Sequence, residues 1–147
     1  MKVDLLFPEL SYKIVDCAFE TYNEIGAGHK EKVFQRAFGL CMRNSGLEVN
    51  EELYFPVEFK ESIVGKNYFD FLVNKQIVVE IKTSDRFTKS HFEQLQNYLV
   101  VSKLRLGILV SFGRTEVKFK RVLNIDLLNK EREQLEKETN TNNNTNL

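Results

Sequence analysis

Tryptophan is absent from this chain of 147 residues, and cysteine, proline and histidine each occur only twice. The cysteines, Cys17 and Cys41, lack C-x-x-C spacing, and neither has a cluster of histidines nearby. We therefore expect no zinc site, and we interpret both cysteines as small buried side chains with free thiols rather than as a disulfide or a nucleophile. Free thiols favour a reducing compartment.

Long apolar runs and a leader-like N-terminus are also missing. The apolar part of MKVDLLFPEL is too short and too acidic for a signal peptide, and no run approaches the length of a membrane span. We therefore expect a cytoplasmic protein without membrane contact. No Ser-His-Asp or Cys-His pattern supports a metal-independent hydrolase, and we interpret His29 and His91 as loop or cap residues rather than bases.

The net charge is zero, with 21 basic and 21 acidic side chains, so the overall charge does not indicate nucleic-acid binding. The distribution is uneven. Residues 1–81 carry 9 basic and 13 acidic side chains, whereas residues 82–121 carry 9 basic and 3 acidic ones. The basic half predicts a surface that faces phosphates, although a solvated lysine-rich face explains the same pattern.

Hydrophobic residues make up 42% of the chain, with twelve Phe and five Tyr, which is enough for one compact core. The last nineteen residues turn from KEREQLEKE to TNTNNNTNL, which lacks apolar side chains before Leu147. We therefore place a single domain at about 8–128 and expect the tail at 129–147 to be disordered.

Hydrophobic periodicity predicts an α/β fold with a mixed sheet between helices. Because a helix connects two apolar strands in the second half, those strands should be parallel neighbours through a crossover. Pro56 indicates an edge strand, whereas the β-branched run Ile77–Ile81 indicates a central one. The expected helices are 11–25, 29–44 and 90–103, and the expected strands are 52–59, 63–73, 77–83, 106–112 and 115–123.

Polar residues interrupt two of these strands. Alternation places Asp70 on one face of its strand, with Phe69 and Phe71 on the other, and places Glu80 and Lys82 on a shared face. If residues 74–76 form a hairpin loop, Asp70 lies opposite Glu80, about 4.5–5.5 Å away. Two such carboxylates call for a cation between them, supplied by Lys82 or by Mg²⁺. A simple cross-strand salt bridge is the alternative interpretation.

The segment Gly28-His29-Lys30-Glu31-Lys32-Val33-Phe34 resembles the signature of the GxxExxY protein family, with Phe34 in place of the usual Tyr. The surrounding segments SYKIVDCAFETYNEIGAG, FDFLVNKQIVVEIKT, FEQLQNYL and LGILVSFG are also similar to that family. It is grouped with the PD-(D/E)xK nucleases, which have a restriction-endonuclease-like core. The resemblance implies that Asp70 and Glu80 bind metal, that Lys82 and Glu31 act in catalysis, and that Gln94 fills the polar position of the later helix.

We therefore expect a Mg²⁺- or Mn²⁺-dependent nuclease that cleaves phosphodiester bonds of DNA or RNA. Arg86 and Lys89, which follow Lys82, are the candidate phosphate contacts. The alternative is a non-catalytic nucleic-acid or protein-binding module that keeps the fold, as a homodimer or an accessory subunit; zero net charge favours it.

Overall fold

The computed structural model describes residues 6–145, which form one five-stranded sheet and four helices. The order along the chain confirms the expected α/β class. In sequence the elements are α1 (Pro8–Ile25), α2 (Glu31–Asn44), β1 (Val49–Phe59), β2 (Ser62–Val73), β3 (Ile77–Lys82), α3 (Lys89–Ser102), β4 (Leu106–Phe112), β5 (Val117–Leu123) and α4 (Ile125–Thr145).

The sheet has the strand order β1-β2-β3-β4-β5, so β3 is central and β1, which contains Pro56, lies at one edge. The pair β3 and β4 is parallel and the other pairs are antiparallel. Because α3 connects the parallel pair, the expected crossover is confirmed. The hairpin register is also confirmed, since Val73 pairs with Ile77.

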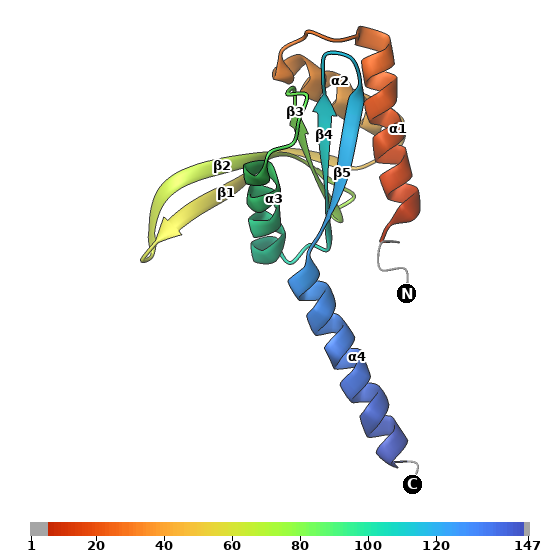
Figure 1. The fold of residues 1–147 in the computed structure, drawn as a ribbon, viewed down its shortest axis with the longest axis vertical. Helices are drawn as coiled ribbons and strands as arrows, with labels where there is room; N and C mark the ends of the chain where they lie inside the picture. The colour runs from red at the N-terminus through yellow and green to blue at the C-terminus, as the bar shows by residue number, and fades with distance from the viewer. Residues whose placement is uncertain (1–5, 146–147) are drawn as a thin grey trace.

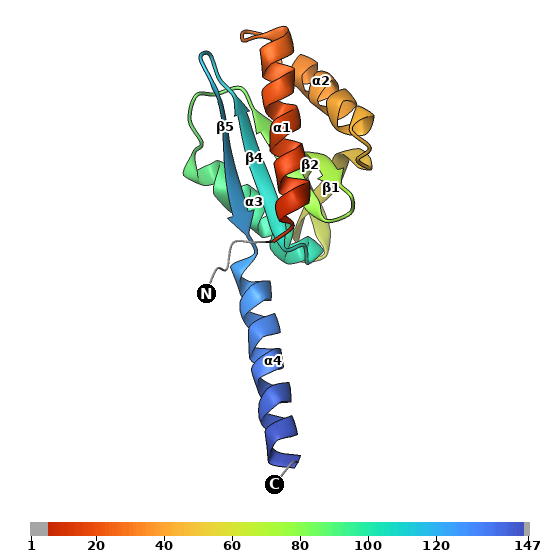
Figure 2. The same cartoon turned by 90° about the vertical axis from the view of Figure 1, so that its right-hand side faces the viewer.

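The helices cover both faces of the sheet (Figure 2). On one face α1 and α2 pack over β3 and β4, and α2 contributes the buried rings of Phe34 and Phe38. On the other face α3 contributes Leu95 and Leu99 to a second, smaller core. Each of these three helices buries one apolar stripe against the sheet, which is the usual way in which such layers are held together.

Strand β2 changes its surroundings at Asp70. Phe71 packs in the core beneath α1 and α2, whereas Phe69 packs against α3, with its ring 4.4 Å from that of Tyr98. A regular strand would place both phenylalanines on one face, so the expectation that they share a face is wrong. The outer part of the β1–β2 hairpin swings away from the sheet (Figure 1).

Helix α4 extends away from the domain (Figure 1) and differs from the expected disorder of 129–147. Residues 129–145 are helical, and residues 146–147 lie outside the described part. The stretch KEREQLEKE consists of strong helix formers, and Arg105 pairs with Glu131 at 2.7 Å, so the helix begins on the domain and continues into solvent. Within residues 6–145, no helix combines the length and apolar character of a membrane span.

Candidate functional site

Asp70 stands where β2 separates from β3. The ladder between these strands runs from the Val73–Ile77 pair to the Phe71–Val79 pair. One step further, the backbone N–H of Ile81 donates to Asp70 Oδ2 at 2.7 Å. A side-chain carboxylate therefore takes a hydrogen bond that a carbonyl of a continuing antiparallel partner would take. The separation leaves this edge of β3 without a strand partner and places a carboxylate beside it.

Glu80 and Lys82 lie on β3 next to this carboxylate, and both are half-buried. The Asp70 carboxyl lies close enough to Glu80 to act on its titration. Burial raises the pKa of Glu80 well above its usual range, Asp70 raises it further, and Lys82 offsets part of the effect. The predicted grouping of these three residues is present.

Glu31 joins the group from another layer of the fold. It is the first residue of α2, whose N-terminus comes close enough to β2 and β3 for its carboxylate to interact with Asp70 and Lys82. Burial raises the pKa of Glu31 above its ordinary value, and Asp70 adds to this, whereas Lys82 lowers it. The structure therefore brings Glu31, Asp70, Glu80 and Lys82 together, as the sequence predicts.

Phe34 fixes the start of α2 over the sheet. Its buried ring stacks on the ring of Phe112 in β4, with the ring centroids 4.6 Å apart and an interplanar angle of 3°. The ring of Tyr22 in α1 is also stacked with both of these rings. The hydroxyl of Tyr22 donates to the carbonyl of Gly113 at 2.7 Å. Phe34 thus acts in packing, one helical turn after Glu31, and holds that carboxylate near the end of β3.

The donor set suits a hard divalent cation. Three carboxylates supply oxygen ligands, and the raised pKa values of Glu80 and Glu31 show that negative charge is unfavourable there without a counterion. Among the described residues, the oxygens of all three do not lie within 4.8 Å of one another. The Asp70–Glu80 pair is therefore the better candidate for metal ligation, with Glu31 at the wall of the site.

His91 is an additional neighbour of this group that the sequence did not reveal. It lies in the first turn of α3, where its backbone N–H donates to Thr88 Oγ1 and its Nδ1 accepts from the backbone N–H of Thr88, both at 3.2 Å. The expected capping role is thus confirmed. Partial burial lowers the pKa of His91, and the charge of Lys82 lowers it further. With Nδ1 as acceptor, the neutral ring carries its proton on Nε2.

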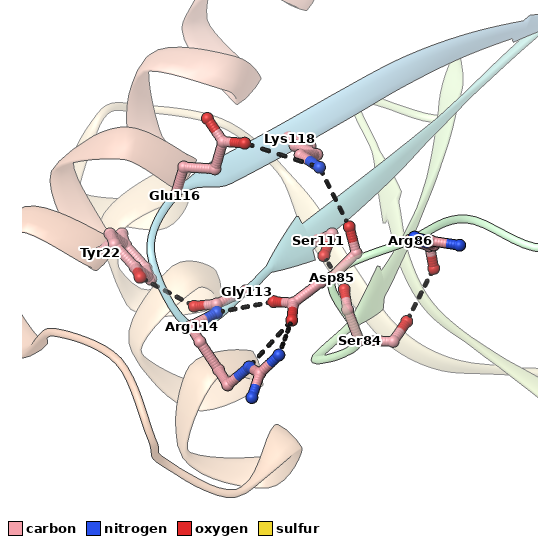
Figure 3. Close-up of polar contacts among 9 residues, drawn as sticks. All are labelled: Tyr22, Ser84, Asp85, Arg86, Ser111, Gly113, Arg114, Glu116 and Lys118. Atoms are coloured by element: carbon pink, nitrogen blue, oxygen red, sulfur yellow. Dashed lines mark hydrogen bonds and ion pairs between the residues drawn. The ribbon is translucent and has the colours of Figure 1, made fainter.

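The loop after Lys82 is anchored to the turn between β4 and β5 (Figure 3). Asp85 accepts from the backbone N–H and the guanidinium of Arg114, each at 2.9 Å, and Lys118 donates to the Asp85 carbonyl at 3.1 Å. A Cβ on Gly113 would come within 2.8 Å of Asp85 Oδ1, so this close approach requires glycine. These contacts hold the path of the chain from Lys82 toward α3.

The remaining predicted residues lie around this loop or further along α3. Arg86 is exposed, and its backbone carbonyl accepts from Ser84 Oγ at 2.9 Å (Figure 3). Lys89 is exposed at the start of α3, and its Nζ lies 3.6 Å from Oε1 of Glu93. Gln94 lines a groove of about 490 Å³ between α3 and the hairpin, beside Pro56 and Asn67. Its predicted catalytic role stays a prediction.

His29 has a local structural contact. Its Nε2 lies 2.6 Å from the carbonyl of Ile25 at the end of α1, and its ring meets Phe34 edge-on at 5.6 Å. This agrees with the interpretation of His29 as a loop residue. It closes the connection between α1 and α2 ahead of Glu31.

Several solved structures are similar to the chain. The alkaline exonuclease LHK-Exo from Laribacter hongkongensis aligns with a TM-score of 0.49 and 14% identity, over 90% of this chain and 77% of that one. The crystal structure of SSO0001 aligns with a TM-score of 0.43 and 20% identity, over 75% of this chain and 65% of that one. The chain thus spans slightly less than two thirds of SSO0001.

Curated proteins give no match to the sequence. A sequence profile, in contrast, covers residues 8–122, which include every residue of the charged group described above. That profile is the one for the PD-(D/E)XK nuclease superfamily, so the chain belongs to the PD-(D/E)XK nuclease superfamily.

Proposed function

We propose that the chain is a metal-dependent nuclease of the GxxExxY group that cleaves phosphodiester bonds of DNA or RNA with Mg²⁺ or Mn²⁺. The carboxyl pair formed by Asp70 and Glu80, with Lys82 beside it, supports this proposal. The bond from Ile81 accounts for Asp70 alone, and a domain with only a structural role has no need for a second half-buried carboxyl, Glu80, and a lysine, Lys82, beside it. Superfamily membership supports the same chemistry.

Each residue has a distinct role in this proposal. Asp70 and Glu80 would hold the cation, and the hydrogen bond from Ile81 fixes the direction of Asp70. A cation held there would supply charge stabilisation to the phosphoryl group and would lower the pKa of a bound water. Lys82 would place a positive charge beside the reacting phosphate, and Glu31, with its raised pKa, would hold or accept a proton at the wall of the site.

A non-catalytic binding module is the second candidate. Zero net charge favours it, and the exposed pair of Lys89 and Glu93 weakens the positive potential of α3. Such a module would bind nucleic acid or protein without needing the carboxyls of Asp70 and Glu80. The two candidates therefore differ in the effect that they predict for the loss of Lys82 on nucleic-acid cleavage.

The test is a cleavage assay with single- and double-stranded DNA and RNA in the presence of Mn²⁺. Wild type, Lys82→Ala and the matched charge control Lys137→Ala, which is exposed on α4, are purified in parallel. We expect Lys82→Ala to lose roughly 10²–10³ in rate while affinity is kept, and Lys137→Ala to match wild type. Cleavage that persists in Lys82→Ala would come from another site or a contaminant and would end the proposal.

A further inference from the structure

A second group of ligand-type side chains lies between α1 and α2. Cys17 and Glu20 on α1 and Cys41 on α2 place two Sγ atoms and one carboxylate oxygen within 4.8 Å of one another. Cys41 Sγ donates to Glu20 Oε2 at 3.2 Å, and Cys17 Sγ lies 3.4 Å from Ser45 Oγ. No residue of the Asp70–Glu80 site takes part.

The helices bring these three residues together by simple geometry. Cys17 and Glu20 are three residues apart, so they project from the same side of α1. Cys41 belongs to α2, which follows α1 after a short glycine-containing connection and packs against it. Ser45, just past α2, donates to the Cys41 carbonyl at 2.9 Å and so holds the end of that helix next to Cys17.

The spacing fits a small tetrahedral ion. With metal–sulfur bonds near 2.3 Å and metal–oxygen bonds near 2.0 Å, tetrahedral ligand atoms lie about 3.5–3.8 Å apart. The Cys41–Glu20 distance of 3.2 Å is slightly shorter, and the other separations do not exceed 4.8 Å. Small rotamer changes therefore suffice to close the group around a cation.

The chemistry of the group selects the class of cation. Burial raises the pKa of the Cys41 thiol, which donates a hydrogen bond to Glu20. Two thiols and one carboxylate bind Zn²⁺-type cations, whereas Mg²⁺ prefers oxygen ligands alone. Binding would displace the thiol protons.

A fourth ligand has room to enter. A pocket of about 430 Å³ opens between α1 and α2, and Glu20, Glu24, Cys41 and Ser45 line it. Water in this pocket can reach a cation held by the three side chains. Three protein ligands with one open position is a common arrangement around Zn²⁺.

We propose that Cys17, Glu20 and Cys41 form a binding site for a Zn²⁺-type divalent cation, with water from the pocket as its fourth ligand. This replaces the expectation from spacing alone that the chain has no zinc site. The site is separate from the hard-cation site of the proposed nuclease. Occupancy would tie α1 to α2, the helix that carries Glu31.

Co²⁺ is the probe for this site, because thiolate ligands give it strong near-ultraviolet charge-transfer absorption that oxygen ligands do not give. The full chain is reduced and titrated with Co²⁺, and Zn²⁺ is then added as a competitor. We expect one equivalent of thiolate-bound Co²⁺, release of protons, and loss of the absorption on addition of Zn²⁺. Absence of the charge-transfer band in a chain with two free thiols would overturn the proposal.

Variants separate ligands from neighbours. Cys41→Ser should abolish the band, and Glu20→Gln, an exposed and structurally mild change, should weaken Co²⁺ affinity by about tenfold or more. Glu24→Gln is the matched control, because Glu24 lines the same pocket but lies outside the three-residue group, and it should bind as wild type does. Equal affinity in Glu20→Gln and Glu24→Gln would refute the assignment of Glu20.

Discussion

The carboxylate of Asp70 accepts a hydrogen bond from the backbone N–H of Ile81 at 2.7 Å, so one side chain both lies near Glu80 and replaces a strand partner of β3 at this N–H. Asp70→Ala removes the acceptor and leaves that N–H unpaired, which should cost about 1–3 kcal/mol of unfolding free energy. Asp70→Asn keeps an acceptor oxygen and removes the charge, so its loss should be clearly smaller. Urea unfolding in a chelator measures both; equal losses would contradict the structural role of this hydrogen bond.

The pH dependence of stability should have an unusual sign in the metal-free chain. Because the pKa of Glu80 is raised above its ordinary value of 4.5, the folded chain holds a proton that the unfolded chain releases above about that pH. Unfolding free energy should therefore fall as the pH rises from about 5 toward 8. Urea unfolding with EDTA at several pH values gives the slope.

Glu80→Gln is the control for this slope, because glutamine cannot release the proton. The variant should lose most of the decline, leaving the smaller contribution of Glu31, whose pKa is raised in the same direction. A slope that is identical in wild type and variant would assign the effect to other groups.

Divalent cations should stabilise the fold through the same carboxylates. A cation that binds only the folded chain at a hundredfold excess over its dissociation constant adds about 2.7 kcal/mol. The melting temperature should therefore rise with Mg²⁺ or Mn²⁺ at millimolar concentrations, and Asp70→Asn should lose the rise. An unchanged melting temperature in wild type would favour the binding-module candidate.

Phosphate contacts by Arg86 and Lys89 would appear in the salt dependence of binding. Each lost contact should lower the slope of log affinity against log salt by about one and weaken binding on every sequence alike. We expect this for Arg86→Ala and Lys89→Ala, measured by fluorescence anisotropy with Ca²⁺ in place of Mg²⁺. Lys137→Ala serves as a remote charge control. A slope unchanged from wild type would place the phosphates elsewhere.

The outer part of α4 should contribute little to stability. Its side chains beyond Glu131 are exposed, up to the last residue whose side chain is described, and the ion pair of Arg105 and Glu131 lies before this outer part. Removal of residues 133–147 leaves this pair in place, and the described side chains that it takes away are all exposed, so the unfolding free energy should fall by no more than about 1 kcal/mol. A larger loss would contradict a domain limited to about 8–128.

The sequence predicted the arrangement of the site where local rules decide it. The short turn after Val73 fixes the hairpin register, and alternation along β3 then places Glu80 and Lys82 on one face. It did not predict the separation of β2 from β3 at Asp70, because alternation assumes a regular strand. On the neighbouring strand β1, Glu52 lies opposite Asp70 and has a positive φ of 54°. A glutamate in the sequence does not indicate such a backbone conformation, so the irregularity could not be predicted.

Contacts between elements that are distant in the chain could not be predicted from the sequence pattern. Cys17 and Cys41 lie on separate helices, and their proximity depends on how α1 crosses α2 rather than on spacing along the chain. His91 could be assigned as a cap from its position, yet its closeness to Lys82 depends on the loop that Asp85 anchors. Residues 129–145 are helical because a helix that begins on the domain can continue into the polar stretch that follows.

Because β2 leaves β3 at Asp70, the outer part of the β1–β2 hairpin can open without unfolding the rest of the sheet. Beyond that residue β1 and β2 pair with each other, and a two-stranded ribbon in water is marginal unless something packs on it. Here Tyr98 packs on Phe55 and Phe69, with ring centroids 5.3 and 4.4 Å away. Amide hydrogens of the ribbon should therefore exchange with solvent through a local opening that leaves β3 and β4 protected. Because Asp70 stands where the ribbon leaves the sheet, we expect this opening to displace the Asp70 carboxyl from Glu80.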